Sequence, residues 1–281
     1  MSAGVLLMAY GSPESPLQMR AFLEEVFRPR AVSESTVRDF QARYRLFGGR
    51  SPLLEISNRQ AEALEKLLHL PVRVGMRHWR PFIRDAVKDL GEPIVGLPLA
   101  PQYSRFSVEK YLGALDAATS AHVLPIRSWH RQPKFLEAWA ERIREGLQRH
   151  RPDAVLFTAH SVPEEAGDPY AQHLRETVEG IRALVPETGS ELAYQSASSA
   201  PLKWLGPDVD SKLRELKLTG VEKVMAAPVS FVSDHAEVLY DLDHLHRVSA
   251  KKLGMTLVRC ESLNDHPLLI QALAEVVRGV L

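Results

Sequence analysis

Short apolar runs alternate with amphipathic stretches along most of the 281 residues, and this alternation limits the fold more than any other feature. The apolar runs have the length and composition of buried parallel strands, at residues 4–9, 72–77, 94–99, 122–126, 154–159, 191–197, 221–227 and 255–259. Helical patterns lie between several of them, at residues 16–27, 53–68, 81–90, 107–118 and 133–149. This order predicts an α/β fold with parallel sheets covered by helices.

Two short strings indicate that the second half of the chain repeats the plan of the first. VLLMAYGSPE and VLFTAHSVPE share an apolar run, an alanine, an aromatic ring, small residues, a proline and a glutamate, and they lie 150 positions apart. This shift pairs Tyr10 with His160. A later pair of strings, at 104–107 and 234–237, has a shift of 130. Unless these likenesses are chance, two similar halves should face each other across a cleft lined by strand carboxyl ends.

His160 is the first catalytic candidate because it follows directly after the apolar run 154–159. In open α/β sheets, ligands bind at the carboxyl ends of the strands. The residues Ser161 to Glu164 resemble an N-cap that begins a helix. A hydrogen-bonded loop histidine without any catalytic role is the alternative.

Glu237 lies in a second cluster of ionisable residues, behind the run 221–227. If Asp234 and Glu237 form a capping box for the next helix, the glutamate is exposed and chemically idle. If Glu237 instead meets His160 in one cleft, the two can accept protons or bind a divalent ion. His244 and His246 follow on the same predicted helix, where we expect them to be solvated.

Residues 28–50 break the pattern and look like an insertion beside a site. Several arginines gather near the two ends of the segment, in a chain without net charge: Arg28, Arg30, Arg43, Arg45 and Arg50. Guanidinium groups bind carboxylates with two parallel hydrogen bonds, so a ligand with several carboxylates would suit this segment. A solvated basic loop is the alternative. A second irregular segment, 196–209, is expected to be a functional loop around Trp204.

Composition excludes several functional classes. The 35 basic and 35 acidic residues balance, so no overall charge attracts nucleic acid. The single cysteine, Cys260, cannot form an internal disulfide or hold an iron–sulfur cluster alone, which favours a reducing cytoplasm. No apolar run approaches the ~18 residues of a membrane span. No glycine-rich motif for a nucleotide occurs, and no organic cofactor is expected. The absence of a G-x-S-x-G motif argues against an α/β hydrolase.

The chain resembles the ferrochelatases over nearly its full length. The matching strings are VLLMAYGSP, YRLFGGRSPL, RHWRPFIRDAV, LAPQYSRFSVEKYL, TAHSVPEEAGDPY, WLGPDV and PVSFVSDHAEVLYDLD. The resemblance implies two Rossmann-like domains with internal pseudo-symmetry, an active-site cleft between them, and a lyase that inserts Fe(II) as its substrate metal. It also implies that His160 and Glu237 face each other over the macrocycle as the catalytic and metal-binding pair.

The MAYG string is similar to the branch of the family that uses coproporphyrin III. This resemblance implies that Tyr10 lies against the iron on the opposite face, and that the product, iron coproporphyrin III, passes to a later decarboxylase to give haem b. The other residues at family positions that contact the propionates or the ring are Ser12, Arg28, Arg43, Tyr44, Ser51 and Tyr111. Asp241 keeps part of the family's acidic row, but Leu245 replaces an expected acid, which weakens a secondary metal site.

The expected domain boundaries rest on the repeat and on this resemblance. Residues 1–132 form an N-terminal domain with the porphyrin-binding insertion at 28–50, and residues 133–264 form the domain that carries His160 and Glu237. Residues 265–281 form a C-terminal helix that packs back on the first domain. We expect a cytoplasmic monomer without an integral membrane segment, with neutral His160 as the active form. The alternatives are a chelatase for protoporphyrin IX or another metal or tetrapyrrole, and a non-catalytic tetrapyrrole carrier.

Overall fold

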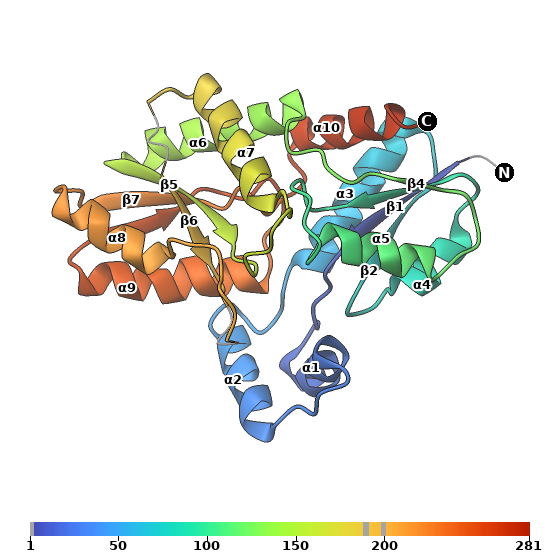
Figure 1. The fold of residues 1–281 in the computed structure, drawn as a ribbon, viewed down its shortest axis with the longest axis horizontal. Helices are drawn as coiled ribbons and strands as arrows, with labels where there is room; N and C mark the ends of the chain where they lie inside the picture. Colours follow the sequence, from blue (N-terminus) through green and yellow to red (C-terminus); the bar gives the residue numbers. More distant parts are fainter. Residues whose placement is uncertain (1–2, 188–190, 198–200) are drawn as a thin grey trace.

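The computed structural model describes residues 3–187, 191–197 and 201–281, which form two four-stranded sheets flanked by helices (Figure 1). The first sheet has the order β2-β1-β3-β4, from β1 Gly4–Ala9, β2 Val72–Met76, β3 Ile94–Pro98 and β4 Val123–Pro125. The second has the order β6-β5-β7-β8, from β5 Ala154–His160, β6 Leu192–Gln195, β7 Lys223–Ala227 and β8 Thr256–Arg259. All neighbouring strands are parallel, so the predicted α/β fold with two parallel sheets is confirmed.

The strand register reproduces the two shifts of the sequence repeat. Leu7 of the central strand β1 pairs with Leu97 of β3, and Phe157 of the central strand β5 pairs with Ala227 of β7. Leu7 and Phe157 are 150 positions apart, while Leu97 and Ala227 are 130 apart. The internal repeat is therefore structural and not a chance likeness of strings.

Helices cover both faces of each sheet. In the first half they are η1 Pro16–Gln18, α1 Met19–Phe27, α2 Glu34–Arg45, α3 Leu53–Leu68, α4 Ile83–Ala86, η2 Val87–Asp89 and α5 Val108–Asp116. In the second half they are α6 Pro133–His150, α7 Tyr170–Leu184, α8 Val209–Leu218, η3 Val238–Leu245, α9 His246–Lys252 and α10 Pro267–Arg278. The second sheet packs against α6 and α7 on one face and against α8, η3 and α9 on the other (Figure 1).

The structure corrects three expectations about local structure. The irregular segment expected at 28–50 contains α2, whose N-cap hydroxyl, Ser33 Oγ, accepts a hydrogen bond from the Thr36 amide at 3.1 Å. No helix begins at Ser161, because α7 starts only at Tyr170. The helix expected at 81–90 is divided into the short α4 and the 3₁₀ turn η2.

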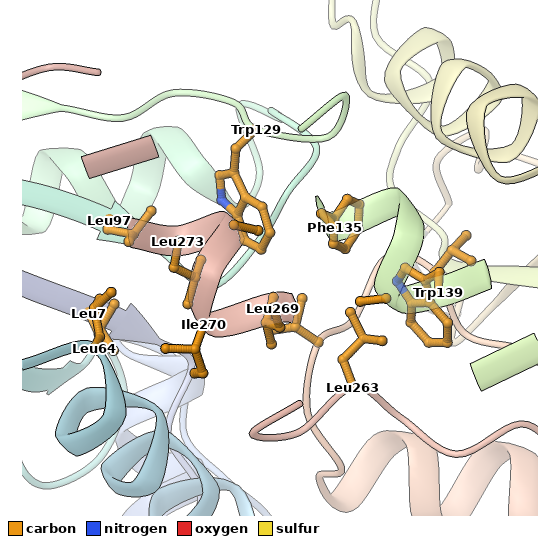
Figure 2. Close-up of a cluster of buried hydrophobic side chains, with 14 of the residues drawn as sticks. Leu7, Leu64, Leu97, Trp129, Phe135, Trp139, Leu263, Leu269, Ile270 and Leu273 are labelled. Atoms are coloured by element: carbon orange, nitrogen blue, oxygen red, sulfur yellow. The ribbon is translucent and has the colours of Figure 1, made fainter. Parts of the chain in front are cut away.

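One apolar cluster joins the two sheets through α6 and α10. It contains Leu7 and Leu97 of the first sheet, Trp139 of α6, and Leu269 and Leu273 of α10, all with no exposed surface (Figure 2). Burying each such side chain stabilises the fold by about 1.5–3 kcal/mol, which is an upper estimate because unfolded chains already bury part of this surface. The cluster thus packs the two sheets and the helices between them into one shared core. No helix in the described part of the chain is long and apolar enough to cross a membrane.

Candidate functional site

The structure brings His160 and Glu237 into direct contact. His160 is the last residue of β5, where its amide donates to Ser230 Oγ at 3.1 Å and its carbonyl accepts from the Tyr170 hydroxyl at 3.0 Å. Its Nδ1 atom lies 2.8 Å from Glu237 Oε1. The side chains are 40% and 28% exposed, so a substrate can reach the pair.

The contact shifts the pKa values of both side chains. Burial opposes a charge on His160, but the charge and hydrogen bond of Glu237 outweigh it and raise the pKa of the imidazole. Burial likewise opposes a charge on Glu237, yet the positive charge and hydrogen bond of His160 lower the pKa of Glu237 to about 2. These shifts favour an imidazolium beside a carboxylate in the pair.

The capping-box interpretation of Asp234 and Glu237 is wrong. Glu237 stands at the N-cap of η3, a π-helix, but its side chain makes no capping hydrogen bond. Asp234 is directed instead toward Arg259, whose Nη1 atom lies 2.9 Å from Asp234 Oδ1. The carboxylate of Glu237 is consequently free to pair with His160, and π-helical turns are often found at functional sites.

Ser196 joins Glu237 to a further carboxylate. The Ser196 hydroxyl donates to Glu237 Oε1 at 2.8 Å and also hydrogen-bonds with Asp241. Its backbone has φ of 62°, a left-handed conformation that is uncommon for a residue other than glycine. Burial and the charge of Glu237 raise the pKa of Asp241. The sequence pattern does not single out Ser196, although its position directly after β6 places it at the same sheet edge.

Aromatic and histidine side chains line the pair on its own half. The Phe231 ring meets His160 edge-on at 6.5 Å between ring centroids and meets His235 at 4.6 Å. His235 Nδ1 accepts a hydrogen bond from the Glu237 amide at 3.2 Å. Burial lowers the pKa of His235, which favours its neutral form.

Tyr10 follows the central strand β1 of the first half, at the sheet edge that corresponds to the position of His160. Its carbonyl accepts from the His78 amide at 2.9 Å, and its ring lies 4.5 Å from the His78 ring. Burial raises the pKa of Tyr10; Arg77 opposes this shift, and the negative charge of Glu237 adds to it. Burial and Arg77 lower the pKa of His78 to about 4. Arg77 and His78 were missed, although they directly follow β2.

Three more of the predicted substrate-binding residues lie on α2 and α5. Tyr44 and Tyr111 are buried, which raises their pKa values, and Tyr10 contributes to both shifts. The Arg43 guanidinium on α2 lies over the Tyr240 ring of η3 at 5.0 Å. The insertion therefore contacts the helix that follows Glu237.

The remaining predicted substrate-binding residues make local contacts. Arg28 is 73% exposed and pairs with Glu25 at 3.1 Å on the surface of α1. Ser51 is buried, and its hydroxyl accepts from the Leu53 amide at 3.4 Å at the start of α3. Ser12 is half-buried in the loop two residues beyond Tyr10.

Two histidines have partners that the local sequence does not indicate. His246 is buried, with Nδ1 at 2.7 Å from Asp210 Oδ1, so the prediction that it is solvated is wrong. His173 stacks on the buried His130 at 3.9 Å between ring centroids. Nothing in the local pattern distinguishes these histidines, because their partners come from distant parts of the chain.

In the described ranges, no group of three or more His, Cys, Asp or Glu side chains is arranged to hold a metal ion. His160 and Glu237 together present one imidazole nitrogen and one carboxylate, the ligand types that could contact a divalent metal ion. The buried Cys260 has a pKa raised by burial to about 12, so its thiolate is not available as a ligand near neutral pH.

Comparison with known proteins gives one consistent family. The family model described as Ferrochelatase matches residues 2–281. The chain is 40% identical to a protein of Deinococcus radiodurans named ferrochelatase, over 98% of this chain and 94% of that protein. It is 37% identical to a protein of Geobacillus kaustophilus named coproporphyrin III ferrochelatase, over 98% and 95% of the two chains.

Solved structures support the same fold at lower identity. SirB from Bacillus subtilis, determined with Fe³⁺, is 15% identical with a TM-score of 0.58, over 100% of this chain and 96% of SirB. CbiX, described as the terminal enzyme of siroheme biosynthesis in denitrifying bacteria, is 14% identical with a TM-score of 0.58, over 99% of both chains. These likenesses concern the two-domain chelatase fold.

Proposed function

The chain belongs to the ferrochelatase family, and we propose that it inserts Fe(II) into coproporphyrin III to give iron coproporphyrin III on the route to haem b. The observation that carries this proposal is the His160–Glu237 pair, joined at 2.8 Å at the carboxyl end of β5, with Tyr10 following the corresponding strand of the other half. A flat macrocycle between Tyr10 and His160 would present its central nitrogens to both.

Metal insertion requires that two pyrrole N–H protons leave as the iron enters. Glu237 engages Nδ1 of His160, so Nε2 is the ring nitrogen that can accept a pyrrole proton or contact the metal. A histidine held in this way by a carboxylate has a fixed orientation and a stabilised charged form. We assign His160 the role of proton acceptor or metal ligand and Glu237 that of its partner.

Two features favour coproporphyrin III over protoporphyrin IX. Relatives from Geobacillus kaustophilus and Anoxybacillus flavithermus, 37% and 36% identical, carry the name coproporphyrin III ferrochelatase. Coproporphyrin III has four propionates where protoporphyrin IX has two, and the arginines near the two ends of residues 28–50 are all exposed. Exposed guanidinium groups on α2 and its flanking loops suit the two additional carboxylates.

The deciding experiment measures Fe(II) insertion by the purified protein under anaerobic conditions, with the two porphyrins alone and in competition. We expect the higher kcat/KM with coproporphyrin III. Preference for protoporphyrin IX or for another metal would contradict the proposed substrate while retaining a chelatase. Tight porphyrin binding without metal insertion would indicate a tetrapyrrole carrier and would refute the proposed reaction. Size-exclusion chromatography of the purified protein tests the proposed monomer. Fractionation of the cells that produce it tests the proposed cytoplasmic location.

A further inference from the structure

Arg259, at the end of β8, is a largely enclosed cation that the proposed chemistry does not use. Its side chain is 12% exposed and pairs with two carboxylates at once. Nη1 lies 2.9 Å from Asp234 Oδ1, Nη2 lies 3.0 Å from Asp243 Oδ2, and Nε lies 3.1 Å from Asp243 Oδ1. The contact with Asp243 is thus the two-pronged arrangement that the planar guanidinium group favours.

The two carboxylates lie on either side of Glu237 in the chain. Asp234 precedes Glu237 by three residues, in the loop that enters η3, and Asp243 follows it by six residues, inside η3. One guanidinium group therefore ties both ends of the segment that carries Glu237 to the end of β8. A shift of η3 along its axis would break at least one of these contacts.

The entry end of the segment is further restrained by Asn264 and Ser262. The Asp234 amide donates to Asn264 Oδ1 at 2.8 Å, and Asn264 Nδ2 donates to Asp234 Oδ2 at 3.1 Å. The Ser262 hydroxyl donates to Asp234 Oδ1 at 2.8 Å. Asp234 thus accepts hydrogen bonds from three side chains and donates one from its backbone amide. These four contacts fix its position.

We propose that Arg259 is a positioning residue for metal insertion, which holds Glu237 against His160 by clamping Asp234 and Asp243. The inference rests on the proposed function. A charge that only stabilised the fold would not have to reach both ends of this segment. Because reactions between positioned groups are sensitive to displacements of about 1 Å, loosening the clamp should slow insertion and leave porphyrin binding intact.

A matched pair of variants tests this role. Arg247 also contacts Asp243, through Nη2 and Oδ1 at 3.2 Å, but it is 49% exposed and its contact is confined to that end of the segment. We expect Arg259→Met to lower kcat for Fe(II) insertion by about tenfold to a hundredfold, with the Kd for coproporphyrin III unchanged within about threefold. Arg247→Met should keep kcat within about twofold.

Two further variants keep the test decisive if Arg259→Met fails to fold. Asp243→Asn retains the Arg259–Asp234 pair and should lower kcat by a few fold. Arg259→Lys keeps the positive charge but lacks the planar guanidinium group, so its kcat should lie between those of Arg259→Met and the wild-type protein. An unchanged kcat in folded Arg259→Met, or in Asp243→Asn, would overturn the positioning role. So would equal losses of kcat and porphyrin affinity. If the wild-type protein itself inserts no metal, the proposed function fails first and separately.

Discussion

The two halves of the molecule share one backbone plan and differ in the side chains at the same sheet edge. Both sheets have their two central strands in the same register, and the central strand leads into Tyr10 in the first half and ends at His160 in the second. In the loops that follow β3 and β7, the corresponding residues are Ser104 in the first half and Asp234 in the second. The ionisable pair lies in one half only, so the repeated fold supplies the positions and the local sequence supplies the chemistry.

The halves also differ in the segments that come after their central strands. The first half inserts α1 and α2 before α3, and these helices bring Tyr44 and Arg43 toward the site. The second half has only a loop before α7. We therefore assign porphyrin binding mainly to the first half and proton or metal transfer to the second, and four predictions test this division.

The largest effect is expected at the paired positions Tyr10 and His160. His160→Ala removes the ring nitrogen to which we assign proton transfer or metal contact. General acid–base catalysis typically contributes 10²–10⁴-fold, so kcat should fall by about that factor. Tyr10→Phe keeps the ring and removes only the hydroxyl, so its kcat should stay within about tenfold. Steady-state Fe(II) insertion into coproporphyrin III measures both. Near wild-type turnover of His160→Ala, or equal losses in the two variants, would contradict the division of roles.

The second prediction concerns the pH dependence of the His160–Glu237 pair. The carboxylate raises the pKa of His160, so Glu237→Gln should lower that pKa. If neutral His160 is the active form, more of it exists at acidic pH in the variant. The acid limb of the kcat profile should therefore move to lower pH, while the plateau falls about tenfold or more because the imidazolium loses its partner.

The control for this prediction is Glu179→Gln, which changes an exposed glutamate on α7. Its pH profile should match that of the wild-type protein. An acid limb that stays in place in Glu237→Gln would show that His160 does not set it.

The third prediction tests substrate binding by the insertion. Arg43→Ala removes an exposed guanidinium that lies 5.0 Å over Tyr240, and one lost charged contact to a propionate should raise KM for coproporphyrin III about tenfold. Because the transfer groups are untouched, kcat should change little. Arg38→Ala, on the same helix and also exposed, should leave both constants unchanged. A fall in kcat with constant KM in Arg43→Ala would instead indicate that residues 28–50 take part in the metal-insertion step.

Local patterns predict much of the fold, and the sheet edge explains why part of the site can be predicted too. Parallel strands end at a common edge, so His160 could be located from the run before it, and Tyr10 from the repeat. Ser196 and Arg259 could not be located in this way, because their roles depend on partners 41 and 25 residues away. The prediction for His246 was wrong for the same reason, since its partner Asp210 lies on another helix. Such contacts arise only from tertiary packing.

The smallest effect is expected at a hydrogen bond that joins the halves. Gln60 on α3 is fully buried, and its Nε2 donates to the Asn264 carbonyl at 2.6 Å and to Ser233 Oγ at 3.0 Å. Gln60→Leu leaves the Asn264 carbonyl without this donor, a loss of about 1–3 kcal/mol in the free energy of unfolding. Leucine also removes Gln60 Oε1, a buried acceptor that has no partner among the described residues, so the net loss should lie near the lower value.

Urea unfolding of Gln60→Leu measures this loss, with Gln148→Leu on the exposed surface of α6 as the control, expected within about 0.5 kcal/mol of the wild-type protein. Asn264 also makes two hydrogen bonds with Asp234. The Gln60–Asn264 contact therefore links the binding half to the segment that carries Glu237. If the shared apolar cluster makes the halves one cooperative unit, a single transition should shift to lower urea with an unchanged slope. Two separate transitions in the variant would instead show that the halves are stable apart, and that Gln60 is needed to couple the binding half to the transfer half.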